Sequence, residues 1–179
     1  SSSGSTTPTQ VVEYAEPPFD SFTHLPGVQS AAKVFVKDQV SLSGGQGSES
    51  VKLMGIQTDQ FGRTAWFRQG LLPYPFFSYL NLLGSNPNAV LISSNLAKKL
   101  NIHTGVQVNL GWQGINAKSF TVYGIIQYFP TYNPNQKDID TNAPSMLVVA
   151  NLSTVQNRLA LEPYQVWLHL KPGASRDAL

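Results

Sequence analysis

The sequence predicts an α+β domain built around a mixed β-sheet. Segments in which apolar and polar residues alternate outnumber segments in which apolar residues recur at helical spacing. The predicted helices are short, and predicted β-hairpins occur together with strand–helix–strand units, which favours a mixed sheet. The chain of 179 residues is long enough for one domain or for two small subdomains.

The composition is that of a folded but charge-poor protein. Hydrophobic residues make up 41% of the chain and charged residues 12%, against about 25% charged residues in a typical globular domain. The basic residues are scattered, so the clustered basic face that nucleic-acid binding requires is missing and no nucleic-acid partner is expected. The absence of cysteine excludes disulfides and thiol nucleophiles. No apolar run approaches the ~18 residues of a membrane-spanning helix.

The N-terminal part combines a linker-like segment with a hairpin. Residues 1–18 are rich in Ser, Thr, Gly and Pro, a composition typical of flexible linkers. Residues 19–25 are predicted to form a short helix followed by a turn. Two β-rich runs, 31–42 and 50–57, flank a Gly-rich loop, and this pattern predicts a β-hairpin.

The middle of the chain is less regular. Residues 58–75 are predicted to form a loop. Phe76, Tyr79, Leu80 and Leu83 then follow at helical spacing, so a helix is expected over 76–83, ended by the glycine that comes next.

Residues 89–110 predict a strand, a short helix and a second strand. Either Ser93 or Ser94 would cap the helix with its hydroxyl group. Leu96 and Leu100 are four residues apart, so one face of the helix would be buried. A strand-to-helix turn can bind phosphate, but that requires glycines between the two elements. None is present here, and a nucleotide site is therefore excluded.

The last third of the chain again alternates strands and a helix. Ser153 and Gln156 have the spacing of a capping box, which would begin the helix. Ala174 or Ser175 would open a further helix, so the chain is expected to be a piece of a polypeptide that continues beyond its C-terminus. The predicted elements are strands over 118–129, 145–152 and 164–170, a polar loop over 130–144, and a helix over 153–161.

No group of residues with catalytic or metal-binding spacing emerges. The three histidines have none of the spacings of zinc motifs. Asp138 and Asp140 are the only close acidic pair, and two carboxylates are too few for a Ca²⁺ loop. Ser30 and Lys33 match the S-x-x-K spacing of some acyl-enzymes but lack the companion motifs. We therefore predict no catalytic residue, no cofactor and no metal site.

Aromatic residues gather in two proline-containing segments. Aromatic side chains in loops can form contact surfaces for proteins or sugars. Phe76 and Phe77 are instead expected to fill the core. The candidate partner-contact surface consists of the aromatic residues expected in or beside loops, namely Trp66, Phe67, Tyr74, Tyr128, Phe129 and Tyr132.

Five segments, taken in order, resemble the extracytoplasmic domain of FtsX-like ABC transporter permeases, the region called the MacB-like periplasmic core domain. The similarity covers most of the chain from about Phe19. Asn101 stands where this family usually has glycine, and asparagine keeps the left-handed conformation accessible. Val106 stands where the family usually has an acidic residue. The segments are MGIQTDQFGRTAWFR, AVLISSNLAKKLNIHTGVQVNL, FTVYGIIQYFPTYNP, SMLVVANLSTVQ and PYQVWLHLKPGA.

The resemblance implies a non-catalytic domain held outside the membrane between two transmembrane helices of a dimeric transporter. A cytoplasmic ABC ATPase subunit would power the motion, and the domain would couple it to substrate export or to an extracytoplasmic protein or cell-wall partner. The implied fold has two lobes: a terminal sheet lobe of residues 19–61 with 163–179, and an inserted α+β lobe of residues 62–162.

Two other functions stay open at the level of the sequence. A secreted or cell-surface module that binds cell-wall sugars or peptides would use the aromatic loops, and its affinity would fall when Tyr74 or Tyr132 is replaced by Ala. An extracytoplasmic hydrolase has less support, because no nucleophile, base and orienting residue can be named together.

Overall fold

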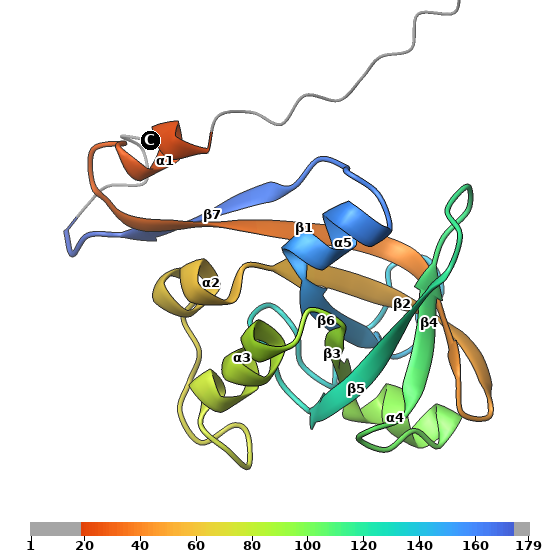
Figure 1. Cartoon of the computed structure of the whole chain (residues 1–179). Coiled ribbons are helices and arrows are strands. Elements are labelled where there is room, and N and C mark those ends of the chain that lie inside the picture. The colour runs from red at the N-terminus through yellow and green to blue at the C-terminus, as the bar shows by residue number, and fades with distance from the viewer. Residues whose placement is uncertain (1–18, 174–179) are drawn as a thin grey trace, which may run out of the picture.

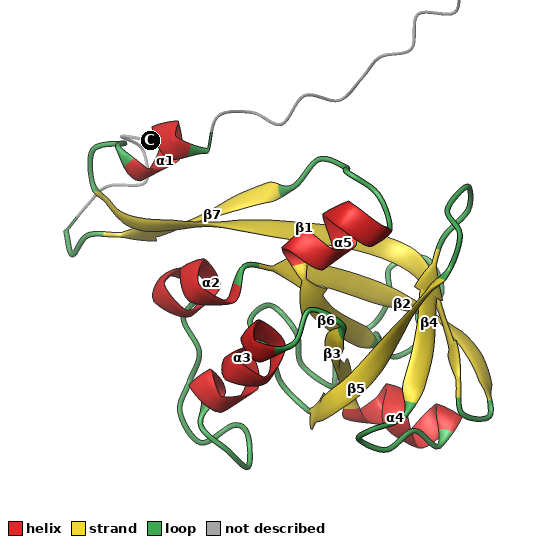
Figure 2. Cartoon of the chain, in the orientation of Figure 1, coloured by secondary structure: helices red, strands yellow, loops and turns green. Residues whose placement is uncertain are grey.

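The computed structural model describes residues 19–173, and the predicted linker over 1–18 and the predicted helix start at Ala174 or Ser175 lie outside this range. Within it, seven strands and five helices confirm the α+β class (Figures 1 and 2). The strands are β1 (Val28–Gly44), β2 (Gly47–Ile56), β3 (Ala89–Ser93), β4 (Gln107–Gly111), β5 (Lys118–Ile126), β6 (Leu147–Asn151) and β7 (Gln165–Leu170). The helices are α1 (Asp20–Thr23), α2 (Thr58–Thr64), α3 (Phe76–Ser85), α4 (Ser94–Leu100) and α5 (Leu152–Arg158).

Six of the seven strands close into a ring, called the barrel below. The pairings run from β1 to β2, then to β6, β3, β5 and β4, and from β4 back to β1. The β2–β6 and β3–β5 pairs are parallel and the others are antiparallel, which confirms the predicted mixed sheet. A closed ring leaves few unpaired strand edges, because each member has a neighbour on both sides.

The seventh strand extends the ring into an arm. Residues 28–34 of β1 pair with β7, whereas residues 41–43 pair with β4. Between these two segments the register of β1 shifts, and Gln39 adopts a positive φ of 57°, as in a β-bulge. The arm therefore consists of the first and last described strands, and it continues into the barrel through β1 (Figure 1).

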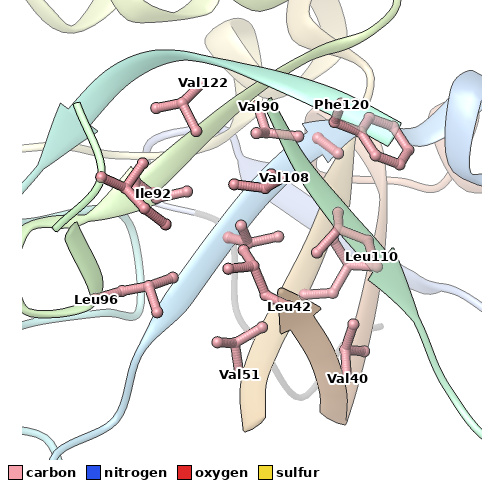
Figure 3. Close-up of a cluster of buried hydrophobic side chains, with 14 of the residues drawn as sticks. Val40, Leu42, Val51, Val90, Ile92, Leu96, Val108, Leu110, Phe120 and Val122 are labelled. Carbon is pink, nitrogen blue, oxygen red and sulfur yellow. The ribbon is translucent and has the colours of Figure 1, made fainter. Parts of the chain in front are cut away.

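The interior of the ring is an aliphatic core to which all six strands contribute (Figure 3). Alternate residues of each strand point inward, as the period of two in a β-strand requires. Leu96 and Leu100 of α4 and Val155 of α5 complete this cluster, so the predicted burial of one face of the α4 helix is confirmed. The strand side chains are Phe35, Val40, Leu42, Val51, Leu53, Val90, Ile92, Val108, Leu110, Phe120, Val122, Val148 and Ala150.

A second core lies on the outer face of the ring. Ala89 and Leu91 of β3 and Val149 of β6 point outward and are covered by α3, while α2 packs beside α3 against β1. Because β3 and β6 are buried on both faces, they read as continuous apolar runs in the sequence. This second cluster is rich in aromatic side chains, among them Phe61 and Phe129.

The predicted hairpin is present, with a tight turn at Gly45 and Gln46. Its tip contacts the end of α4, where the backbone N–H of Gln46 donates a 2.9 Å hydrogen bond to the carbonyl oxygen of Leu100. Gly45 has a φ of +56°, and a Cβ atom there would lie 2.2 Å from the same oxygen. Only glycine fits this close approach.

The predicted loop over 58–75 was partly wrong, because its first seven residues form α2. Gly62 lies in the middle of this helix and lowers its intrinsic propensity, which hides the helix in the sequence. A Cβ atom at Gly62 would lie 3.0 Å from the ring of Phe77. The glycine thus lets α2 approach α3, and tertiary packing outweighs the local preference.

Both predicted side-chain caps were wrong. Ser93 does occupy the N-cap position of α4, but its hydroxyl makes no capping hydrogen bond. Helix α5 begins at Leu152 after the N-cap residue Asn151, so Ser153 lies inside the first turn and cannot form the capping box with Gln156. The predicted left-handed end of α4 is confirmed, since Asn101 has φ 53° and ψ 51°.

The predicted division into lobes stays a prediction. The hairpin strands of the predicted terminal lobe, β1 and β2, pair with β4 and β6 of the predicted inserted lobe. Only the arm formed by β7 and residues 28–34 of β1 stands apart from these pairings.

Candidate partner-contact surface

The loop between α2 and α3 and the first turn of α3 carry large apolar side chains into solvent. Trp66 is 78% exposed, Tyr74 68% and Phe77 61%. The prediction that Phe77 fills the core was wrong, because α3 turns it outward beside Gly62 of α2. Large apolar side chains that gather in this way mark interaction surfaces more often than isolated ones do.

These side chains border a groove of about 640 Å³ between the α2–α3 loop and the end of β7. Two prolines, Pro73 and Pro75, stiffen the loop on one side of it. Arg63, Arg68, Gln69 and His169 are among the charged or polar residues of its lining. Arg63 lies 3.8 Å from Asp59 on the same helix, whereas Arg68 has no ion-pair partner within residues 19–173.

The six residues of the predicted contact surface separate into three groups. Trp66 and Tyr74 lie exposed at the groove, and Phe67 lines it while half-buried. Phe129 and Tyr132 are 2% and 6% exposed, so their prediction as surface contacts was wrong.

Tyr128 is half-buried and packs against the second core without lining the groove. The backbones of Phe129 and Tyr132 hydrogen-bond to each other, so this segment turns back on itself and both side chains are buried. The sequence could not separate these groups, because it does not show this turn.

A chain of aromatic contacts connects the groove to the core. The ring of Phe67 stacks on Phe76 with centroids 4.7 Å apart, and Phe76 lies 5.8 Å from Phe129. Phe129 stacks on Phe61 at 5.5 Å, and Phe61 lies 5.3 Å from Trp167 of β7. Such ring pairs add stabilisation beyond the burial of their area. The loop is therefore held on a rigid aromatic base that reaches the arm.

The buried polar groups at the β3–α4 turn join strands instead of forming a site. The hydroxyl of Ser93 donates to Oδ1 of Asn95 at 2.6 Å and accepts from the backbone N–H of Leu147 at 3.0 Å. Asn95 Nδ2 and the hydroxyl of Tyr132 both donate to the carbonyl oxygen of Ser145, at 2.8 and 2.9 Å. Burial raises the pKa of Tyr132, so its hydroxyl stays a donor. These contacts fasten the loop that follows β5 onto the turn.

The acidic pair of the long loop serves the loop itself. Oδ1 of Asp138 accepts hydrogen bonds from the backbone N–H groups of Asp140 and Thr141, at 2.9 and 3.0 Å. These hydrogen bonds lower the pKa of Asp138. Asp140 instead accepts a 3.3 Å hydrogen bond from Gln39 of the β-bulge. Both carboxylates thus order the polypeptide near the bulge.

No group of three or more potential metal ligands occurs within residues 19–173. The described histidines lie apart on the chain, with His24 after α1, His103 after α4 and His169 in β7. In the same range no helix has both the length and the apolar character that a bilayer span requires. The aromatic groove combines a depression with exposed apolar side chains, and it is the candidate contact site.

The fold is similar to that of three solved structures. The extracellular domain of the noncanonic ABC-type transporter YknZ from Gram-positive bacteria has 15% identity and a TM-score of 0.53, covering 86% of this chain and 71% of that chain. The periplasmic region of MacB from Actinobacillus actinomycetemcomitans has 15% identity and a TM-score of 0.51, covering 88% and 65%. A domain of a putative permease protein from Porphyromonas gingivalis has 16% identity and a TM-score of 0.53, covering 87% and 67%.

These identities are low, so the likeness to the solved structures establishes the fold alone. No curated protein is significantly similar in sequence. The sequence matches the family description of the MacB-like periplasmic core domain over residues 2–179. This match confirms the predicted family and the predicted extracytoplasmic placement, and the chain belongs to the MacB-like periplasmic core domain family of ABC transporter permeases.

Proposed function

We propose that this domain couples ATPase-driven motion of membrane helices to an extracytoplasmic partner or substrate, without chemistry of its own. The family is that of ABC transporters, which work with cytoplasmic ATPases. The observation that carries the proposal is the arm, in which the first and last described strands pair with each other through the β1–β7 ladder. A displacement applied at both chain ends would act on this ladder and pass along β1 into the barrel.

The rigid construction of the barrel supports this role. Coupling requires an element that moves as a body, because a soft element would absorb the displacement. The ring of paired strands and its filled interior provide such a body. The β-bulge at Gln39 interrupts the β1–β2 ladder between the arm residues 28–34 and residues 41–43, which pair with β4. A bend of the arm relative to the rest of the barrel would be placed at this bulge.

The test uses the full-length permease with its ATPase subunit in lipid nanodiscs. The 179 residues contain no cysteine, so Gln46→Cys at the exposed hairpin tip, with any cysteine elsewhere in the permease replaced by serine, places one spin label on each protomer's barrel. We expect the label-to-label distance to differ between the nucleotide-free state and the ATP-bound state. An unchanged distance with a demonstrably active ATPase, or a permease that associates with no ABC ATPase, would contradict the proposal.

The partner contact is proposed to lie at the aromatic groove. Trp66, Tyr74 and Phe77 are exposed on a rigid base, and aromatic anchors of this kind dominate the energetics of protein interfaces. The same observation favours a second candidate, a binding module for cell-wall sugars or peptides. Saturable binding of purified peptidoglycan fragments that is lost in Tyr74→Ala, together with nucleotide-independent label distances, would favour that second function.

A further inference from the structure

The aromatic groove continues into a second groove, of about 600 Å³, that runs along β7. Ala65, Trp66 and His169 line both grooves. Trp66 thus stands between two halves of one trough, which extends from Phe77 on α3 to Leu170 at the end of β7. An elongated depression of this kind fits an extended chain better than a compact ligand.

One wall of the trough is a strand edge. Within residues 19–173, β7 pairs only with β1, so its other edge has no strand neighbour. Residues 167–170 of this strand line the second groove. An unpaired edge presents a row of N–H and C=O groups to which an added strand can bind. The backbone therefore selects an extended peptide as the occupant.

The charge of the trough selects the character of that peptide. Within residues 19–173 no Asp or Glu lines either groove, and none occurs in the sequence between Asp59 and Asp138. Arg63 and Arg68 both line the first groove, and Arg68 lacks an ion-pair partner within the described range. A partner with carboxylates would meet complementary charge here, and one with ammonium groups would be repelled.

A separate depression, outside the trough, gives a useful contrast. It lies beside the hairpin and is lined by Asp38, Glu49 and Asp138 together with two lysines. Lys99 lies 3.0 Å from Glu49, and Lys52 lies 3.9 Å from Asp38. There both lysines are paired with carboxylates, and no large aromatic side chain of the described residues lines the surface. The trough differs from it in holding both unpaired positive charge and exposed apolar anchors.

We propose that the trough binds an extended acidic peptide segment of an extracytoplasmic partner, added as a strand to the free edge of β7. Its main chain pairs with residues 167–170. One of its apolar side chains lies against Trp66 and Phe77, and a carboxylate on the same segment meets Arg68. The inference rests on the proposed partner contact and adds the chemistry and conformation of the partner.

The test is an NMR titration of the ¹⁵N-labelled domain with a defined probe. The probe is the peptide acetyl-Val-Glu-Val-Glu-Val-Glu-Val-amide, and its control carries Lys in place of Glu. We expect saturable shifts of the Trp66 indole N–H and of the backbone amides of residues 167–170 with the acidic peptide alone. Arg68→Glu should weaken binding about tenfold. Lys98→Glu changes the same charge on α4, outside the trough, and should leave binding unchanged.

Several outcomes would overturn the inference. Equal binding of the Lys peptide would contradict the proposed preference for acidic residues. Shifts at Trp66 without shifts in β7 would contradict the proposed addition of a strand to β7. Absence of peptide binding, with binding instead to vesicles of phosphatidylglycerol and phosphatidylcholine, would assign the trough to a membrane surface. None of these results changes the label distances that test the coupling function, so the two proposals can fail separately.

Discussion

The barrel interior and the trough use apolar residues in opposite ways. In the barrel, aliphatic side chains from six strands face one another and are almost fully buried. In the trough, Trp66, Tyr74 and Phe77 face solvent although they are larger and more apolar than most surface residues. The barrel side chains are positioned by strand pairing, whereas Trp66 and Tyr74 lie in a loop with two prolines and Phe77 in the first turn of α3.

The difference separates residues that specify the fold from residues that are available for binding. Burial of an aliphatic side chain contributes ~1.5–3 kcal/mol to folding, whereas an exposed aromatic side chain contributes little and keeps its contact area for a partner. The aromatic contacts from Phe67 through Phe61 to Trp167 join the two regions. The loop can therefore be exposed and still be held in place.

Truncation of a side chain in the barrel interior should cause a large loss of stability. Leu42 is fully buried within the ring, and Leu42→Ala should lower the free energy of unfolding by ~2–5 kcal/mol because it leaves a cavity. Urea denaturation followed by circular dichroism measures this loss. Leu161→Ala removes the same atoms at a site that is 47% exposed and should change stability by less than ~0.5 kcal/mol. Similar losses in both variants would mean that the ring does not dominate folding.

The hairpin tip comes next. Gly45→Ala places a methyl group against the carbonyl oxygen of Leu100 and forces alanine into the left-handed region, with an expected loss of ~2–3 kcal/mol. Gly70 also has a positive φ, but a Cβ atom there would have no other atom within 4 Å, so Gly70→Ala should lose only ~1 kcal/mol. Thermal denaturation of both variants isolates the contact, and equal losses would show that it is unimportant.

A substitution in the turn between β3 and α4 should lower the free energy of unfolding by an intermediate amount. Ser93→Ala leaves the N–H of Leu147 without its hydroxyl acceptor, at an expected cost of ~1–2 kcal/mol. Ser94→Ala is the matched control. The Ser94 hydroxyl takes no part in the hydrogen bonds that join the described residues of this turn. A helix-capping role for Ser94 would reverse the order of the two variants in a urea denaturation experiment.

Tyr132 sharpens the comparison, since it was predicted on the surface and lies in the core. Tyr132→Phe should cost ~1 kcal/mol at neutral pH through the lost hydrogen bond to Ser145. Burial raises the pKa of Tyr132 above its ordinary 10.0. The unfolded chain therefore loses this proton first as the pH rises, and the wild type loses stability from about pH 10 upward. The difference in free energy of unfolding between the wild type and Tyr132→Phe, measured by urea denaturation, should therefore narrow in that range. A difference that stays constant with pH would contradict the burial of Tyr132.

Much of the fold could be predicted from local patterns, and the site only in part. Alternation along β1, β4 and β5 and the paired Leu96 and Leu100 fix their buried faces, because these patterns depend on neighbouring residues alone. Helix α2 was missed because it packs against β1 and α3, which are distant in sequence or follow later in the chain, and because Gly62, which allows the approach to α3, lowers its helix propensity. The closure of the ring depends on contacts between distant segments, to which periodicity is blind.

The candidate surface shows the same limit at the level of single residues. Trp66 and Tyr74 lie in a loop beside prolines, as predicted, and they are exposed. Phe129 and Tyr132 lie in a similar sequence context, but their segment folds back onto α2 and the β3–α4 turn. Proline-rich surroundings predict a loop, but they do not predict which face of the loop is covered.

The smallest effect on stability should come from the trough, and it tests the central claim that these aromatic residues lie outside the folding core. The double variant Trp66→Ala with Tyr74→Ala should lower the free energy of unfolding by less than ~1 kcal/mol. Phe61 is a fully buried aromatic residue that stacks on Phe129 beneath the loop. Phe61→Ala should lower the free energy of unfolding by ~3–5 kcal/mol. Urea denaturation of the two variants beside the wild type gives the answer. A loss of several kcal/mol in the double variant would show that the exposed aromatic residues belong to the fold and not to a contact surface.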